Sequence, residues 1–186
     1  MHEQTLANPI RLTYQDYCAL PEDGMRYEIL NGDLFMSPSP QTHHQRVVGR
    51  LFRILSDHVE SRGLGEVFVA PFDVLLGEHD IVEPDLIFVA TANRTIVTEK
   101  HIRGAPDLLV EIVSSTRPDY DVRDKRAVYA RCTVPWYWTV EPEHRRLTEL
   151  RLVGGAYQLE AESVGETTFR PALFSGLSIP LSRLWA

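Results

Sequence analysis

The sequence predicts one α+β (α/β) domain, in which short apolar strands and amphipathic helices follow one another along the chain. The first observation is a pair of apolar runs, residues 86–89 and 107–113, whose Leu, Val and Ile content is typical of strands buried on both faces. The second is a pair of segments, residues 42–62 and 119–131, in which apolar side chains recur at helical spacing. With 186 residues, 44% of them hydrophobic, the chain is long enough for a single domain, residues 1–186, with its own core.

Composition and charge limit the classes of function. The formal net charge is -7 and the pI is near 5.5, so the chain lacks the overall positive field that dominates non-specific binding to nucleic acids. A DNA partner would therefore need a local basic patch. Cys18 and Cys132 lie far apart and in no metal-binding spacing, which predicts a reducing compartment, the cytoplasm, and no disulfide framework. Because there is no signal-sequence pattern and no apolar run near the ~18 residues of a membrane span, we expect a soluble protein without a membrane partner.

Capping and turn signals define the other elements. Thr13 and Asp16 form a capping-box pattern that predicts a short helix ending near Pro21. The rest of the chain between these elements consists of short apolar runs separated by Pro and Gly residues. They predict a strand pair, or one strand bent around Pro71, over 66–70 and 72–76, a turn at 77–80, a strand over 81–90, a short helical stretch over 94–100 and a strand over 136–140.

Two hairpins are expected, one near each end of the chain. Residues 26–30 and 33–36 flank Asn31-Gly32, a dipeptide that favours a tight hairpin turn. Residues 146–152 and 157–160 flank a Gly-Gly turn and predict a C-terminal β-hairpin.

Acidic side chains lie inside the two apolar runs. Asp85 follows Pro84 at the start of the first run, and in the second run strand alternation places Asp107 and Glu111 on one face. An ionised carboxylate in a low-dielectric site costs several kcal/mol unless it is paired, hydrogen-bonded or bound to a metal. These acids therefore need a partner, although Asp107 stands at the start of its strand, where a turn or capping role is at least as good an explanation.

Lysine is rare in this chain. Of 19 basic side chains only Lys100 and Lys125 are lysines, and lysine, unlike arginine, can shift its pKa usefully when it is buried. In the helix expected over 119–131, Lys125 falls in the middle of the apolar stripe. The opposite side carries Arg123, Arg126, Ala127, Ala130 and Arg131. Alternatively, Lys125 forms an i,i+4 salt bridge to Asp121, with its ammonium reaching water along the helix edge.

The helix expected over 42–62 has two distinct sides. Its apolar stripe consists of Val47, Val48, Leu51, Ile54, Leu55 and Val59. His44 lies over this stripe, either as a satisfied core histidine or as a site residue at the edge of the core. Arg46, Arg50 and Arg53 fall on the other side, which is either a solvated face or a surface that faces DNA.

Several short segments, in this order, resemble the Uma2 branch of the PD-(D/E)XK nuclease superfamily, a group of restriction-endonuclease-like proteins. They are Tyr27-Glu28-Ile29-Leu30-Asn31-Gly32, Ser37-Pro38-Ser39-Pro40, His44-Gln45-Arg46, Val82-Glu83-Pro84-Asp85-Leu86, Gly104-Ala105-Pro106-Asp107-Leu108, Tyr129-Ala130-Arg131 and Pro135-Trp136-Tyr137-Trp138. The resemblance covers roughly residues 11–185. It implies a PD-(D/E)XK restriction-endonuclease-like core, a mixed β-sheet flanked by helices, with the site at the edge of the sheet.

The resemblance also implies the site residues. Asp85 and Glu111 would be Mg²⁺ ligands, and the substrate would be a phosphodiester. One position departs from the superfamily pattern, because Val113 stands where the lysine is expected. In the Uma2-like branch that lysine is thought to lie on the following helix, where Lys125 is the candidate.

The chemistry fits these residue types. Mg²⁺, with Mn²⁺ as an alternative ion, is held by one or two carboxylates, waters and, here, the carbonyl of Ile112. The ion would activate a water as the nucleophile, and Lys125 would orient that water or offset the transition-state charge. His44 and Glu28 match family positions near the same edge and are expected as a second acid/base or a further metal contact.

The sequence therefore predicts a Mg²⁺-dependent endonuclease that hydrolyses DNA phosphodiester bonds. A homodimer is a further expectation. The alternative is a binding or regulatory module that keeps the nuclease fold without hydrolysis, which the acidic net charge favours, and a purely structural role for the buried acids is the third interpretation.

Overall fold

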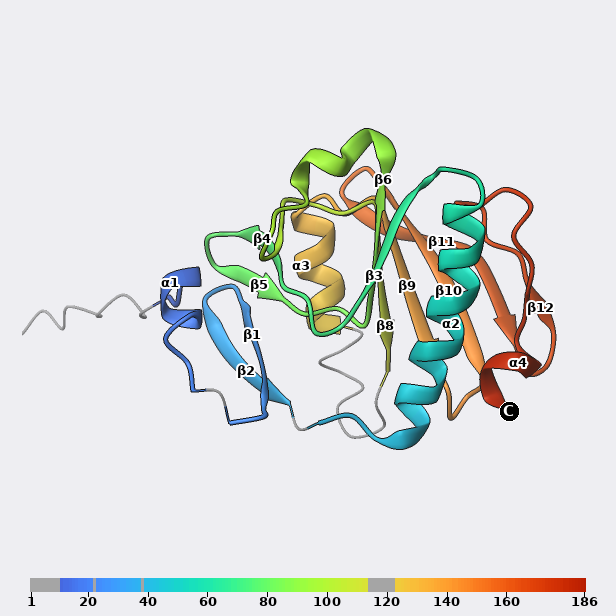
Figure 1. Ribbon diagram of the computed structural model, residues 1–186, viewed down its shortest axis with the longest axis horizontal. Coiled ribbons are helices and arrows are strands. Elements are labelled where there is room, and N and C mark those ends of the chain that lie inside the picture. Colours follow the sequence, from blue (N-terminus) through green and yellow to red (C-terminus); the bar gives the residue numbers. More distant parts are fainter. Residues whose placement is uncertain (1–10, 22, 38, 114–122) are drawn as a thin grey trace, which may run out of the picture.

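The computed structural model describes residues 11–21, 23–37, 39–113 and 123–186 (Figure 1). Its helices are α1 (Tyr14–Tyr17), α2 (Thr42–Glu60), the 3-10 helix η1 (Thr91–Ile96), α3 (Lys125–Arg131) and α4 (Ser182–Trp185). Its strands are β1 (Arg26–Leu30), β2 (Asp33–Ser37), β3 (Gly65–Val69), β4 (Val74–Gly77), β5 (Asp80–Val82), β6 (Leu86–Ala90), β7 (Ile102–Arg103), β8 (Leu108–Ile112), β9 (Trp136–Glu141), β10 (Arg146–Val153), β11 (Ala156–Val164), β12 (Thr168–Phe169) and β13 (Ile179–Pro180).

The strands form two main sheets and one short pair, β12 with β13. The larger sheet has six strands in the order β11-β10-β9-β8-β6-β3, with β8 and β9 parallel and the other neighbours antiparallel. The smaller has five strands in the order β2-β1-β5-β4-β7 and is also mixed, because β4 and β7 are parallel. Mixed sheets with few helices confirm the predicted α+β class.

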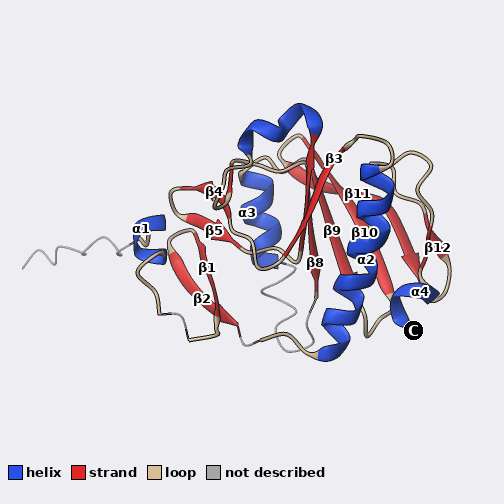
Figure 2. Ribbon diagram, in the orientation of Figure 1, coloured by secondary structure: helices blue, strands red, loops and turns tan. Residues whose placement is uncertain are grey.

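Helices cover both faces of the six-stranded sheet, as Figure 2 shows. On one face α2 buries Val47 and Leu51 in the cluster that contains Val110 of β8. On the other face α3 buries Val128 in the cluster that contains Leu109. All five residues of β8 are buried, which confirms a strand enclosed on both faces.

Both predicted hairpins are present. The β1–β2 turn places Asn31 and Gly32 at φ 57° and 87°, the positive values that a tight hairpin turn requires. A Cβ at Gly32 would also lie 2.6 Å from Cβ of Arg11. The C-terminal hairpin pairs β10 with β11 around Gly154 and Gly155, and β11 runs on to Val164, beyond the predicted end at 160.

Of the two alternatives over 66–76, the structure has two strands, which do not pair with each other, and the single strand predicted over 81–90 is wrong in its continuity. Each segment is two strands that belong to different sheets, β3 and β4 in the first case and β5 and β6 in the second. Pro84 has no N–H to donate to a ladder, and the N–H of Glu83 donates to the side chain of Glu28 instead. The chain passes from one sheet to the other between β3 and β4 and again between β5 and β6. A hydrogen bond joins these two connections, since the N–H of Ala70 donates to the carbonyl of Asp85 at 3.1 Å.

Other boundaries shift less. The capping box of Thr13 and Asp16 is present at the start of α1. The helical stretch predicted over 94–100 is the 3-10 helix η1, which begins and ends earlier. The helix predicted over 119–131 is described from its second half onward as α3, and residues 119–122 lie outside the described part of the chain.

Among the described helices, none combines the length and the apolar character needed to cross a bilayer.

Candidate active site

The candidate site begins where β6 and β8 pair. Leu86 of β6 lies opposite Val110 of β8 in the antiparallel register, so Asp85 comes next to Glu111 and Ile112. The N–H of Ile112 donates to Oδ2 of Asp85 at 2.7 Å. Both acids are only 3% exposed. The structure thus brings the two predicted metal ligands together at one end of the neighbouring strands β6 and β8, which are inner strands of the six-stranded sheet.

Two basic side chains reach Asp85. His44 Nε2, at the start of α2, lies 3.2 Å from Oδ2, and Arg26 Nη1, on β1, lies 3.2 Å from Oδ1. Burial alone would raise the pKa of Asp85, but the hydrogen bond with His44 and the charge of Arg26 outweigh it, and the pKa is lowered. Asp85 is therefore ionised at neutral pH.

The pKa of Glu111 is shifted in the opposite direction from that of Asp85. Its Oε1 accepts hydrogen bonds from Lys125 Nζ at 3.0 Å and from the hydroxyl of Tyr129 at 2.6 Å. Burial, with the charges of Asp85 and Glu28, raises the pKa of Glu111 to about 7 against the opposing charge of Lys125. Of the two predicted metal ligands, Glu111 is the one that would gain most from added positive charge.

Lys125 joins Glu111 to the smaller sheet. Its Nζ lies 2.9 Å from Oε1 of Glu28, and this oxygen also accepts from the N–H of Glu83 at 2.9 Å. Burial would raise the pKa of Glu28, but Lys125 and Arg26 lower it. Lys125 is only 1% exposed, so its ammonium does not reach water along the helix edge as the alternative interpretation required. Asp121, the partner in that alternative, lies outside the described residues.

Three members of the cluster were not predicted as site residues: Arg26, Glu83 and Tyr129. Arg26 Nε lies 3.1 Å from Glu83 Oε1, and burial raises the pKa of Glu83 to about 6. The four acids Glu28, Glu83, Asp85 and Glu111 raise the pKa of Arg26, although burial opposes them. Sequence signals existed for two of the three, since Arg26 shares a strand face with Glu28 and Tyr129 lies one helical turn after Lys125.

Two of the singled-out positions play structural parts elsewhere. Asp107 lies at the other end of β8, where its Oδ2 accepts from the N–H of Ala90 at 2.8 Å and from Asn93 Nδ2 at 3.2 Å. This capping arrangement matches the alternative given for Asp107. Arg50 is half-buried and donates to the carbonyls of Leu184, at 3.0 Å, and Ala186, so the predicted face of three arginines on α2 is wrong at its middle residue.

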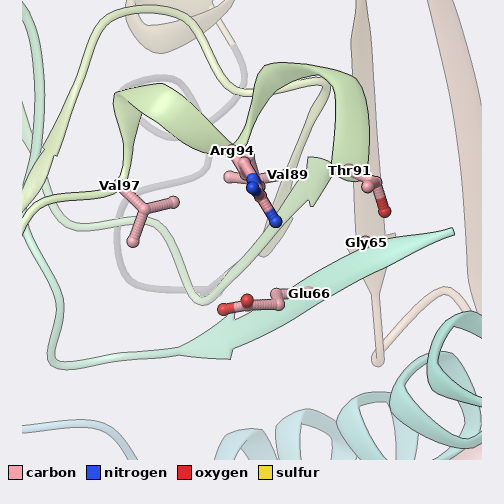
Figure 3. Close-up of a pocket in the computed structure, with 6 residues that line it drawn as sticks. All are labelled: Gly65, Glu66, Val89, Thr91, Arg94 and Val97. Carbon is pink, nitrogen blue, oxygen red and sulfur yellow. The ribbon is translucent and has the colours of Figure 1, made fainter. Parts of the chain in front are cut away.

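A separate hollow of about 120 Å³ lies at the far end of β6 from Asp85 (Figure 3). It is lined by Gly65, Glu66, Val89, Thr91, Arg94 and Val97. Figure 3 shows Glu66 on its strand facing Arg94 on the 3-10 helix. None of the residues of the acidic cluster lines this hollow, so it is not the candidate site.

The donor set fits a hard divalent cation in type and charge. In the described ranges, no three His, Cys, Asp or Glu side chains are grouped so that they could hold a metal ion together. The two carboxylates of Asp85 and Glu111, with water, are however sufficient for Mg²⁺. The acids of the cluster outnumber its permanent cations, Arg26 and Lys125, by two. A divalent ion would neutralise this excess.

Comparisons with known proteins support the fold and give the family. A crystal structure of a protein from Anabaena variabilis ATCC 29413, described as a putative nuclease belonging to DUF820, matches with a TM-score of 0.74. The match covers 94% of this chain and 97% of that chain at 18% sequence identity, a level that shows a shared fold. No curated protein matches the chain. The Uma2 family model, described as "Putative restriction endonuclease", matches residues 14–182, and the chain therefore belongs to the Uma2 family.

Proposed function

We propose that this protein is a metal-dependent endonuclease that hydrolyses DNA phosphodiester bonds. The observation that carries the proposal is the meeting of Asp85, Glu111 and Lys125 in one buried cluster, from two paired strands and a helix. The family description supports the same reaction class. Restriction-endonuclease-like families generally use divalent metal ions.

The metal ligands in this proposal are Asp85 and Glu111, with the carbonyl of Ile112 as a further oxygen donor. The ion would be Mg²⁺, with Mn²⁺ as an alternative. When bound, it would lower the pKa of a water and polarise the phosphoryl oxygen. Arg26 and Lys125 hold these carboxylates in the metal-free protein, so both cations must yield part of their contact.

Lys125 is assigned to the attacking water and to the charge of the transition state. Its ammonium is fixed between Glu28 and Glu111 at 2.9 and 3.0 Å, and a fixed charge in a water-poor site stabilises developing negative charge without reorganisation. Glu28 is a positioning residue for Lys125, because its own carboxylate is anchored by the N–H of Glu83.

His44 and Tyr129 complete the machinery. Tyr129 donates to Glu111 at 2.6 Å and restricts that carboxylate to one orientation. His44 Nε2 contacts Asp85, and its Nδ1 is buried without a hydrogen-bond partner among the described residues. We assign His44 to one of two roles, a second acid/base or a further metal contact beside Asp85.

The competing proposal is a non-catalytic module that binds or regulates. One observation favours it, namely that the carboxylates of Asp85 and Glu111 are already satisfied by Arg26, His44, Lys125 and Tyr129 without a metal. The same contacts would also hold the two carboxylates in place before a metal binds.

Nicking of supercoiled plasmid, with and without Mg²⁺ or Mn²⁺, decides between the two. The nuclease proposal expects nicking that needs the metal and is lost in Asp85→Asn. Asp107→Asn is the matched control, because it makes the same change at the far end of β8. If calorimetry shows no metal binding that Asp85→Asn removes, the non-catalytic alternative stands.

Two further expectations, the cellular compartment and the oligomeric state, go with the proposal. The cytoplasm remains the expected compartment, in agreement with the free thiols of Cys18 and Cys132. A homodimer also remains an expectation, and light scattering after size exclusion would measure it directly.

A further inference from the structure

The outer side of α3 and the turn of the β10–β11 hairpin form an open groove of about 460 Å³. Arg123, Arg126 and Arg131 line it on one side, and Gly155, Ala156 and Tyr157 line it on the other. No acidic side chain of the described residues lines the groove. In a chain of net charge -7, this is the kind of local basic patch that a DNA partner would need.

The three arginines differ in their contacts and in their exposure to solvent. Arg126 Nη2 donates to the carbonyl of Tyr157 at 2.9 Å, which fixes the guanidinium across the groove and uses one of its five N–H donors. Arg123 is exposed. Arg131 makes two 2.8 Å contacts with Asp80, so its charge is largely neutralised. The positive charge available to a ligand therefore comes mainly from Arg123 and Arg126.

The groove lies on the helix that supplies Lys125 to the candidate site. Arg126 is the next residue in the chain, and Arg123 precedes Lys125 by two positions, within one helical turn. One side of α3 therefore buries its ammonium among the acids, while the other presents guanidinium groups to solvent. The groove and the candidate site therefore share α3 and lie on opposite sides of it.

The other basic face expected from the sequence, on α2, is less suited. Its middle residue Arg50 is used to hold the end of the chain through Leu184 and Ala186. Arg46 and Arg53 remain exposed, and neither lines the groove on α3. They serve as matched controls for charge alone.

We propose that the α3 groove binds the phosphate backbone of duplex DNA through Arg123 and Arg126, independently of base sequence. Guanidinium groups bind phosphate oxygens strongly, and such contacts position a protein on DNA without reading its sequence. This inference rests on the proposed nuclease function and deepens it, because it names the surface that would bring DNA to the acidic cluster.

The test measures binding of a fluorescein-labelled duplex of about two helical turns by anisotropy, with the full chain in EDTA so that no cleavage occurs. Salt is varied, and wild type is compared with Arg123→Ala, with Arg123→Ala plus Arg126→Ala, and with the control Arg46→Ala plus Arg53→Ala. Each true phosphate contact should lower the salt slope by about one and the affinity roughly eight-fold at 0.1 M salt. The loss should be the same for unrelated sequences.

The outcomes separate this inference from the nuclease proposal. A reduced slope in the α3 variants but not in the α2 control supports the groove, even if no metal-dependent nicking is found. Equal losses in both, an unchanged slope in the α3 variants, or no DNA binding by wild type at low salt overturns it, while metal-dependent nicking would still leave the nuclease proposal standing. Because Arg126→Ala also removes a contact to Tyr157, the single variant Arg123→Ala at an exposed position decides the result if the double variant is unfolded.

Discussion

Lys125 Nζ and Glu111 Oε1 lie 3.0 Å apart, although the two residues are 14 positions apart in the chain. Lys125 is on a helix and Glu111 is on a strand. In the superfamily pattern, the lysine would stand two residues after the glutamate on the same strand, at Val113. Here the helix brings an ammonium to the same carboxylate from the other direction. Lys125 is therefore identified by its contact with Glu111 in the folded protein and not by its spacing from Glu111 in the sequence.

Exchange of the two lysine positions is the first prediction. Lys125→Ala should lose nicking while it keeps metal binding, because Asp85 and Glu111 remain. Val113 points to the same face as Glu111, so Val113→Lys combined with Lys125→Ala should recover part of the activity. Recovery should be incomplete, since burial of a new ammonium costs stability. Plasmid nicking and metal calorimetry on the same preparations measure both properties.

The control for this exchange is Lys125→Arg, which keeps the charge. It should rescue little, because the guanidinium is larger and does not fit between Glu28 and Glu111, which lie 2.9 and 3.0 Å from the ammonium. Full activity in Lys125→Ala alone would contradict the assignment and leave Lys125 as a structural counterion of the two glutamates.

The second prediction concerns the proposed metal ligands. Asp85→Asn and Glu111→Gln should each abolish metal-dependent nicking and keep the fold, because each amide has nearly the shape of the acid it replaces and, at Glu111, the change also reduces repulsion with Asp85 and Glu28. Without metal, the melting temperature should hold or rise for Glu111→Gln, whose pKa is raised, and fall for Asp85→Asn, whose carboxylate is stabilised by Arg26 and His44. With Mg²⁺ or Mn²⁺ it should rise for wild type only, since a ligand stabilises the state that binds it. A variant that unfolds at room temperature would instead indicate a structural role for that acid.

Much of this site can be predicted from the sequence because its main features are local. The acid inside the apolar run over 107–113 and the lysine inside the apolar stripe of the next helix are periodicity signals. These signals are sufficient to single out Glu111 and Lys125. The strand order that places Asp85 beside Glu111 follows from the family resemblance, since periodicity alone does not say which strands are neighbours.

The parts that the sequence did not predict depend on contacts between distant segments. Arg26 reaches Asp85 across 59 positions, and this contact requires that β1 lies beside the crossing between the sheets. The same crossing divides the predicted strand over 81–90. Pro84 is visible in the sequence, but only the pairing of β5 with β1 and of β6 with β8 shows that the chain changes sheets there.

The third prediction is a pH dependence of stability in the metal-free protein. The pKa of Glu111 is raised to about 7, above its ordinary value of 4.5, so the folded state binds more protons than the unfolded state between these two values. Stability should therefore fall as pH rises from about 4.5 to about 7, by up to roughly 3 kcal/mol for this one group. Urea unfolding at pH 5 and pH 7.5 measures the difference.

Glu111→Gln is the variant that checks this pH effect. It should remove most of the fall, while the smaller share from Glu83, whose pKa is raised to about 6, should remain. The pKa values of Asp85 and Glu28 are lowered, so their contributions are lost only when the pH falls toward acid and do not overlap with this window. An equal fall in wild type and in Glu111→Gln would contradict the assignment to Glu111.

The last prediction concerns Arg26, which holds Asp85 in the metal-free protein at 3.2 Å and lies 3.1 Å from Glu83. A divalent ion must compete with this guanidinium for the same carboxylate, so Arg26→Gln should bind Mn²⁺ more tightly, by about ten-fold or more, as expected for the removal of a like charge within a few ångströms. The variant should also melt at a lower temperature without metal, because the buried acids lose a cation, and should show a larger metal-induced rise. Titration calorimetry and thermal melts test both, with Arg46→Gln as the exposed control. Weaker metal binding in Arg26→Gln than in the control would mean that Arg26 orients Asp85 for the ion instead of competing with it.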